Sequence, residues 1–200
     1  MAEKLNVSKQ LDSSIDEINE LFPGGDAALR FIASAETDYG RYNPETALSY
    51  GPYQIDPIGY YDAVQNPGLT GKHRERINKI NDYLKDRFED PSFDITTLAK
   101  YNPETNDYLP ETRNLKYLRD PLVGTALARL KMLKDPHEIL SGEENLSKYY
   151  QRLWGPKWSQ SQDENIKSKK RQEAIEKYRR YNTPSSTMEQ AKLTNSAFTQ

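Results

Sequence analysis

The chain has 200 residues, a length that usually corresponds to one domain with appended segments. It carries 28 basic and 30 acidic side chains, so its net charge of -2 provides no general attraction to nucleic acid or anionic membranes. The chain has no cysteine, which excludes disulfides and thiolate–zinc sites. Its two histidines, His73 and His137, lie far apart in polar surroundings. We expect both to be solvated, and we expect neither a metal nor a cofactor.

The first 25 residues form a predicted helical segment. Ser14-x-x-Glu17 has the spacing of a capping box, which predicts that a helix opens there. Pro23-Gly24-Gly25 ends the segment. Its apolar stripe consists of Leu11, Ile15, Ile18 and Phe22.

A second helix is predicted from Asp26 to Glu36. Its apolar residues and Glu36 fall on a single face, so the carboxyl group of Glu36 points toward the core. Burial and the negative end of the helix dipole should both raise the pKa of Glu36, which suits a proton donor near neutral pH. The alternative is an ordinary solvated glutamate, or an ion pair with Arg30 or Arg41. The stripe consists of Ala28, Leu29, Ile32, Ala33 and Glu36.

The middle of the chain alternates turns and helices. Three X-Pro pairs in residues 41–56 predict a turn-rich region with a short β-hairpin. Helices are predicted near 57–65, 72–88 and 119–134, with a long polar connection at 89–117. Asp120-Pro121 opens the 119–134 helix, and a further helix ends at Gly155-Pro156. Tyr-Asn-Pro-Glu-Thr occurs at 42–46 and again at 101–105, which we attribute to turn chemistry around Asn-Pro. The apolar stripes of the last two helices are Leu122, Val123, Ala126, Leu127, Leu130 and Leu133, and Leu146, Tyr149, Tyr150, Leu153 and Trp154.

From Ser159 onward the composition becomes very polar. Residues 163–181 are dense in charge with only a thin apolar stripe, and residues 182–200 are rich in Ser, Thr, Asn and Gln. We therefore expect a charged helix and a polar tail, together residues 157–200, to stand outside the core. The basic cluster at 167–171 could contact phosphates, but its acidic and amide neighbours favour a solvated helix face.

The motif around Glu36 resembles that of a known family. Glu36-Thr37, followed by Ser49-x-Gly51-x-x-Gln54-Ile55-x-Pro57, is similar to the pattern of bacterial and phage lytic transglycosylases. The 121–133 segment is similar to the family's next helix, which commonly has a small residue where this chain has Gly124. The resemblance covers residues 26–156. The chain departs from the pattern at Thr37, at Pro52-Tyr53 and at Tyr149-Tyr150, where the family commonly has Ser, Leu-Met and Tyr-Asn.

The resemblance implies a mainly α, lysozyme-like domain at 26–156, with a small β-hairpin beside the cleft and a C-terminal extension. It implies that Glu36 acts first as acid and then as base in cleaving the β-1,4 bond of peptidoglycan, leaving a 1,6-anhydro product. Ser49, Gly51 and Gln54 would line the cleft and bind the N-acetyl sugar. Tyr149 or Tyr150 would bond the acid or stack on a sugar ring. Loop bracing by Gln54 and core packing by the two tyrosines are the structural alternatives.

Two other functions remain open. A hydrolytic lysozyme would need a second carboxylate, for which Asp56 or Asp38 could serve. A virion structural or ejection protein could keep this scaffold with little activity. The first residues lack the apolar core of a signal peptide, and no apolar run is long enough to cross a membrane. We therefore expect a phage particle to deliver the protein to the cell wall during genome entry, with residues 159–200 contacting other virion proteins.

Overall fold

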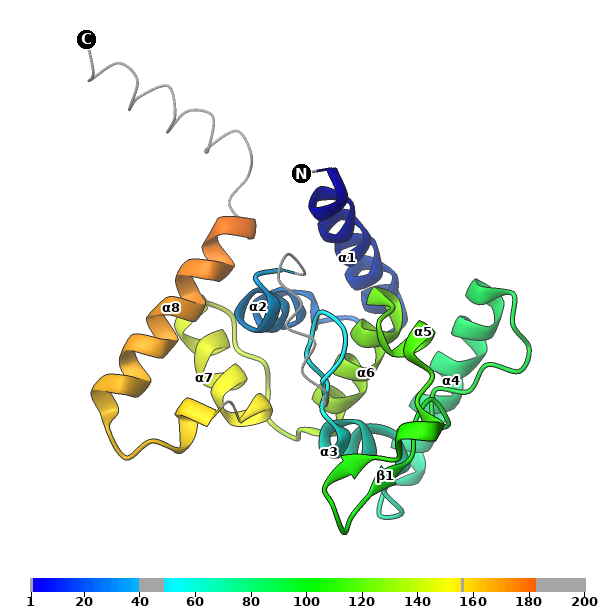
Figure 1. Cartoon of the computed structure of the whole chain (residues 1–200). Coiled ribbons are helices and arrows are strands. Elements are labelled where there is room, and N and C mark those ends of the chain that lie inside the picture. The colour runs from blue at the N-terminus through cyan, green and yellow to red at the C-terminus, as the bar shows by residue number, and fades with distance from the viewer. Residues whose placement is uncertain (1, 40–48, 156, 183–200) are drawn as a thin grey trace.

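The computed structural model describes residues 2–39, 49–155 and 157–182 (Figure 1). These residues are mainly helical, with one small antiparallel sheet. The α-helices are α1 (Ala2–Leu21), α2 (Asp26–Thr37), α3 (Pro57–Tyr60), α4 (Gly71–Phe88), α5 (Leu115–Leu118), α6 (Pro121–Lys134), α7 (Glu143–Trp154) and α8 (Glu164–Asn182). The shorter elements are the π-helix η1 (Tyr61–Gln65), the 3-10 helices η2 (Pro110–Thr112) and η3 (Lys157–Gln160), and the strands β1 (Tyr101–Asn102) and β2 (Asp107–Tyr108).

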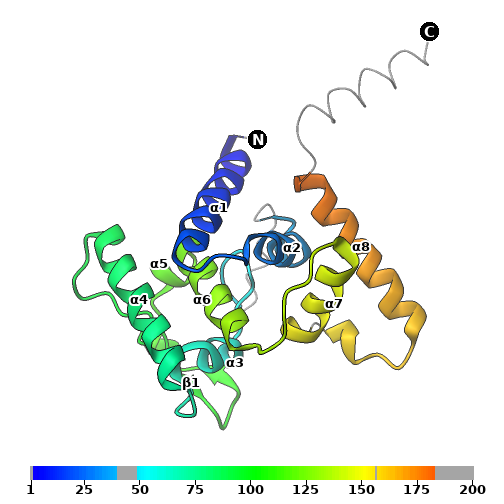
Figure 2. The same ribbon diagram turned by 180° about the vertical axis from the view of Figure 1, so that it is seen from behind.

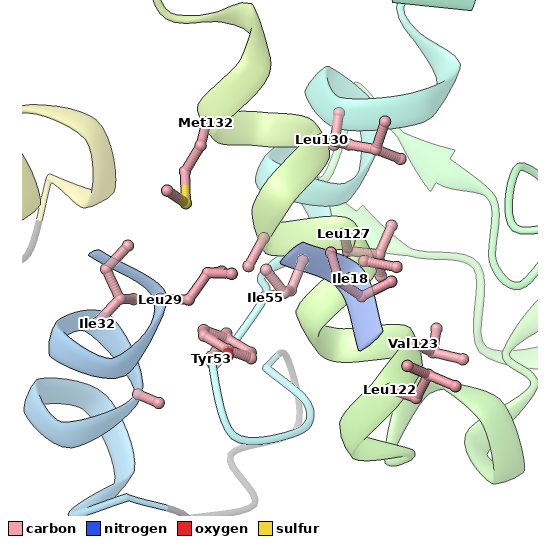
Figure 3. Close-up of a cluster of buried hydrophobic side chains, with 14 of the residues drawn as sticks. Ile18, Leu29, Ile32, Tyr53, Ile55, Leu122, Val123, Leu127, Leu130 and Met132 are labelled. Atoms are coloured by element: carbon pink, nitrogen blue, oxygen red, sulfur yellow. The ribbon is translucent and has the colours of Figure 1, made fainter. Parts of the chain in front are cut away.

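Helix α6 forms the centre of the fold. The carboxylate of Asp120 caps its N-terminus by accepting hydrogen bonds from the backbone N–H groups of Leu122 and Val123, at 2.8 and 3.3 Å. The predicted opening at Asp120-Pro121 is therefore confirmed. Side chains of α1, α2 and the 49–56 loop pack around this helix, as the labelled residues in Figure 3 show.

The 49–56 loop lies directly on α6. Gly124 permits this approach, since a Cβ at that position would lie 3.3 Å from Cδ of Pro52. Tyr53 is fully buried, and its hydroxyl lies 3.3 Å from Oγ1 of Thr125 on α6. Backbone hydrogen bonds join Tyr50 and Ile55 as an isolated antiparallel bridge. The loop is thus a tight turn braced against the central helix.

The two-stranded sheet lies elsewhere in the sequence than the predicted hairpin. Strands β1 and β2 pair Tyr101 with Tyr108, within the segment that we expected to be a polar connection. Residues 40–48, which include the rest of the predicted hairpin and the first Tyr-Asn-Pro-Glu-Thr copy, lie outside the described residues. In the second copy, Oδ1 of Asn102 accepts a hydrogen bond from the N–H of Glu104 at 3.0 Å, as the turn interpretation predicts.

The 89–117 connection also contributes to the core. Six of its apolar side chains are almost completely buried, and the rings of Phe93 and Tyr117 meet edge to face with centroids 4.9 Å apart. The polar composition of residues 89–117 therefore did not indicate that this segment contributes to the core. Its buried residues are Phe93, Ile95, Leu98, Ala99, Tyr108 and Tyr117.

Helix α8 packs against α2 and α7, which corrects the prediction that the charged segment stands outside the core. Ala174 and Ile175 are buried, and the ring of Tyr178 lies 5.2 Å from that of Phe31 on α2. The Nζ of Lys177 donates a hydrogen bond to the carbonyl oxygen of Ala35 at 3.1 Å. Both views show α2, α7 and α8 together on one flank and α4 on the other (Figure 2).

Two further predictions were wrong. Helix α1 begins at Ala2, so Ser14 lies inside it, and its hydroxyl donates to the carbonyl oxygen of Gln10 at 2.7 Å instead of capping the helix. His73 is buried rather than solvated, and its Nε2 lies 2.8 Å from the carbonyl oxygen of Ala63. Burial lowers the pKa of His73, which favours the neutral ring. His137 is exposed, as predicted.

Candidate functional site

The last turn of α2 carries Glu36. The apolar face of this helix is completely buried at Leu29 and Ile32, and Glu36 itself is partly buried. The helix ends at Thr37, and the Asp38 that follows adopts the left-handed conformation while its N–H donates to the carbonyl oxygen of Ser34 at 3.1 Å. The carboxyl group therefore sits at a fixed point near the end of a rigid helix.

Tyr150 on α7 binds this carboxyl group directly. Its hydroxyl donates a hydrogen bond to Oε1 of Glu36 at 2.7 Å. The Tyr150 ring is buried and lies 6.0 Å from the ring of Phe31, so packing fixes the position of the hydroxyl. Core packing and bonding to the acid had been alternatives for this tyrosine, and Tyr150 does both.

Charged groups from three further elements act on Glu36. Burial raises its pKa, which confirms the direction predicted from the helix pattern. The hydrogen bond from Tyr150 and the cations Lys177 on α8 and Lys131 on α6 oppose this rise, whereas the negative charge of Asp56 adds to it. The site thus favours a protonated acid but provides partners for its ionised form.

Lys131 and Trp154 are also neighbours of the site, although the sequence motif around Glu36 did not include them. The Nζ of Lys131 lies 4.5 Å from the centroid of the Trp154 ring, and the indole N–H donates to the carbonyl oxygen of Tyr53 at 3.0 Å. Burial lowers the pKa of Lys131, while the carboxylates of Asp56, Asp62 and Glu36 oppose that effect. The available sequence signal was a lysine beside the apolar stripe of α6, which is also typical of an ordinary helix C-terminus.

The 49–56 loop is tied to α2 through the residue that follows Glu36. Oγ1 of Thr37 donates to the carbonyl oxygen of Pro52 at 2.8 Å. Within the loop, the Gln54 side-chain amide donates to the carbonyl oxygen of Gly51 at 2.9 Å, which is the bracing role considered for Gln54. Gly51 has a φ of +71°, and a Cβ there would lie 3.1 Å from the Leu118 carbonyl oxygen.

The remaining predicted site residues are less closely joined to the acid. Ser49 is partly buried and makes no side-chain hydrogen bond to another described residue. The hydroxyl of Tyr149 is buried without a hydrogen-bond partner in the described part of the chain. Its ring lies 5.1 Å from the Arg152 guanidinium, and burial raises the pKa of Tyr149 to about 12. Neither residue shares a described contact with Glu36.

The two candidate second carboxylates have structural roles. Oδ1 of Asp56 accepts a hydrogen bond from the N–H of Gly59 at 2.7 Å and so caps α3, yet the residue remains exposed. Asp38 lies 3.8 Å from the Arg180 guanidinium of α8. The negative charge of Asp56 contributes to the raised pKa of Glu36.

Comparisons with known proteins find no matching family model, no matching curated protein and no matching solved structure. Across residues 2–39, 49–155 and 157–182, no group of three His, Cys, Asp or Glu side chains is arranged to hold a metal ion. Within those same ranges no helix is both long and apolar enough to span a membrane.

Proposed function

We propose that this protein cleaves peptidoglycan glycan strands as a lytic transglycosylase, with Glu36 as general acid and then base. The observation that carries the proposal is the 2.7 Å hydrogen bond from Tyr150 to a partly buried carboxyl group whose pKa is raised. A raised pKa retains the proton that the leaving oxygen must receive. The resemblance in sequence supplies the reaction class.

The neighbours of Glu36 suit both steps of this reaction. Once the proton has left, the carboxylate is stabilised by the Tyr150 hydroxyl and by the charges of Lys131 and Lys177. It can then accept a proton from the sugar hydroxyl that closes the 1,6-anhydro ring. The substrate's own N-acetyl group would support the oxocarbenium-like transition state, so one carboxyl group is sufficient.

Glu36→Gln tests the role of the acid. The amide retains the size of the side chain and an acceptor for Tyr150 but has no proton to transfer, so we expect cleavage of purified peptidoglycan to fall by about 10²- to 10⁴-fold. Glu75→Gln is the matched control, since Glu75 is exposed on α4. Cleavage by Glu36→Gln at the rate of the control would remove Glu36 from the mechanism.

The second candidate function is hydrolysis, with Asp56 holding the attacking water. Asp56 is a better candidate for this role than Asp38 because it is exposed and because its charge acts on Glu36. Mass spectrometry of the digest separates the two reactions, because transglycosylation leaves anhydro ends and hydrolysis leaves reducing ends. Asp56→Asn is a suitable variant because asparagine is an equally good N-cap for α3. We expect anhydro ends and an active Asp56→Asn protein.

We also propose that a phage particle carries the protein. Contacts with other virion proteins would then use the exposed charged face of α8 and residues 183–200. Because the buried face of α8 packs on α2 and α7, any contact between α8 and other virion proteins must use the opposite face of the helix. A virion structural protein with little activity is the outcome if purified protein releases no glycan fragments.

A further inference from the structure

A pocket of about 350 Å³ lies beside Lys131, at the junction of α6 and α7. Charged side chains form most of its lining, and they come from η1, the end of α6, the segment that follows it, and α7. The lining includes Lys131, Lys134, Arg152, Asp62 and Asp135. The pocket has room for a group the size of an amino-acid residue.

Two of the three cations in this pocket are already neutralised. The Nζ of Lys134 lies 2.5 Å from Oδ1 of Asp62, and the Arg152 guanidinium lies 2.6 Å from Oδ2 of Asp135. Each of these pairs joins an amine or guanidinium to a carboxylate of the same pocket. Among the lysine and arginine side chains of the lining, Lys131 is therefore the one that forms no ion pair with a described residue, although the carboxylate of Asp62 acts on it from a greater distance.

The ammonium group of Lys131 has a fixed position but forms no ion pair with a described residue. It lies over the Trp154 ring and makes no hydrogen bond or ion pair with any residue in the described part of the chain. The described residues therefore provide no acceptor for this partly buried ammonium group, and solvent in the pocket is left to supply its hydrogen bonds. An incoming carboxylate would supply both the acceptor oxygens and the opposite charge.

Lys131 also connects the pocket to the proposed acid, because it lies over Trp154 on α7, the helix whose Tyr150 binds Glu36, and its charge acts on that of Glu36. An anion bound at Lys131 would therefore sit near the bond to be cleaved. In peptidoglycan, carboxylates at that location belong to the stem peptide, which branches from the sugar beside the glycosidic bond. This identification rests on the proposed function.

We propose that the pocket is a subsite for the stem peptide of peptidoglycan, with Lys131 binding one of its carboxylates. Lys134 and Arg152 shape the pocket and stay paired with their aspartates. The pocket would make the protein prefer peptide-bearing glycan over glycan from which the stems have been removed.

Calorimetric titration tests this preference without turnover if every protein carries Glu36→Gln. The two probes are a soluble peptidoglycan disaccharide with its tetrapeptide stem and the same disaccharide without peptide. We expect the peptide-bearing probe to bind at least about tenfold more tightly, since the hydrogen bond from an ammonium group to a carboxylate is charge-assisted. Lys131→Met should abolish the difference while retaining contact with Trp154, and Lys131→Arg should retain most of it.

Lys72→Gln is the control, because it removes one positive charge from an exposed position on α4. Thermal unfolding of each variant shows whether it is folded at the titration temperature. If the Lys131→Met protein is unfolded there, the affinities of the Lys131→Arg protein for the two probes test the inference instead. Equal affinity for the two probes in the parent protein, or an unchanged preference in Lys131→Met, would overturn this inference alone. Binding of neither probe would instead overturn the proposed function.

Discussion

At the scale of single residues, the hydroxyl groups of Tyr149 and Tyr150 provide a direct comparison. Tyr150 donates to Glu36, whereas Tyr149 has a buried hydroxyl with no hydrogen-bond partner in the described residues. Tyr150→Phe removes a donor that stabilises the ionised carboxylate, so the pKa of Glu36 should rise further. The alkaline limb of the pH–rate profile should then move to higher pH. Tyr149→Phe should leave that limb in place.

A carbon-13 NMR titration of the Glu36 carboxyl group measures the same shift without requiring activity. The expected order of pKa values is Tyr150→Phe above wild type, with Tyr149→Phe equal to wild type. A wild-type titration curve in the Tyr150→Phe protein would show that the hydrogen bond does not control the acid.

The raised pKa of Glu36 also predicts that the stability of the protein depends on pH. This pKa is raised in the folded protein, so folding favours the protonated form. The corresponding stabilisation is complete below the unfolded-state pKa of about 4.3 and is lost as pH rises through the folded-state pKa. Glu36→Gln cannot ionise, so its free energy of unfolding relative to wild type should be higher at pH 8 than at pH 4. Urea denaturation at the two pH values measures this, and an unchanged difference would contradict it.

At the scale of secondary-structure elements, α8 contains two isoleucines in opposite environments. Ile175 is 1% exposed and packs in the core, whereas Ile166 is 45% exposed on the same helix. Ile175→Ala should lower the free energy of unfolding by about 2–4 kcal/mol, and Ile166→Ala should change it by less than about 1 kcal/mol. Chemical denaturation of the pair measures how much α8 contributes to the fold. Equal effects would mean that α8 does not pack as described.

The helices that could be predicted from sequence are those whose apolar residues recur at helical spacing. The predicted ranges of α2, α4 and α6 agree with the structure to within two residues, and the predicted end of α7 at Gly155 is confirmed. Helix α8 was predicted as a helix, but its burial was not, because a thin stripe is sufficient only when a neighbour such as Phe31 supplies the rest of the contact. Strands of two residues each were too short for any alternation to indicate their position.

At the scale of the whole molecule, the candidate site brings together residues from five separate segments, which are α2, the 49–56 loop, α6, α7 and α8. Sequence could place Glu36 on a buried face, since that depends on one helix alone. The choice of Tyr150 over Tyr149 depends on how α7 is rotated against α2, and the position of Lys131 depends on how α6 and α7 meet. Both are consequences of packing between elements, which a local pattern does not contain.

The contact between Lys131 and Trp154 also makes the protein its own optical probe. The chain has two tryptophans, so replacing Trp158 with Phe leaves the indole of Trp154 as the sole long-wavelength emitter. That indole lies 4.5 Å from an ammonium group lining the pocket. A charge so close to the ring changes the energy of its excited state. An anion that binds Lys131 would therefore change the wavelength or intensity of the Trp154 fluorescence. Fluorescence of the unlabelled protein would then follow occupancy of the pocket in real time.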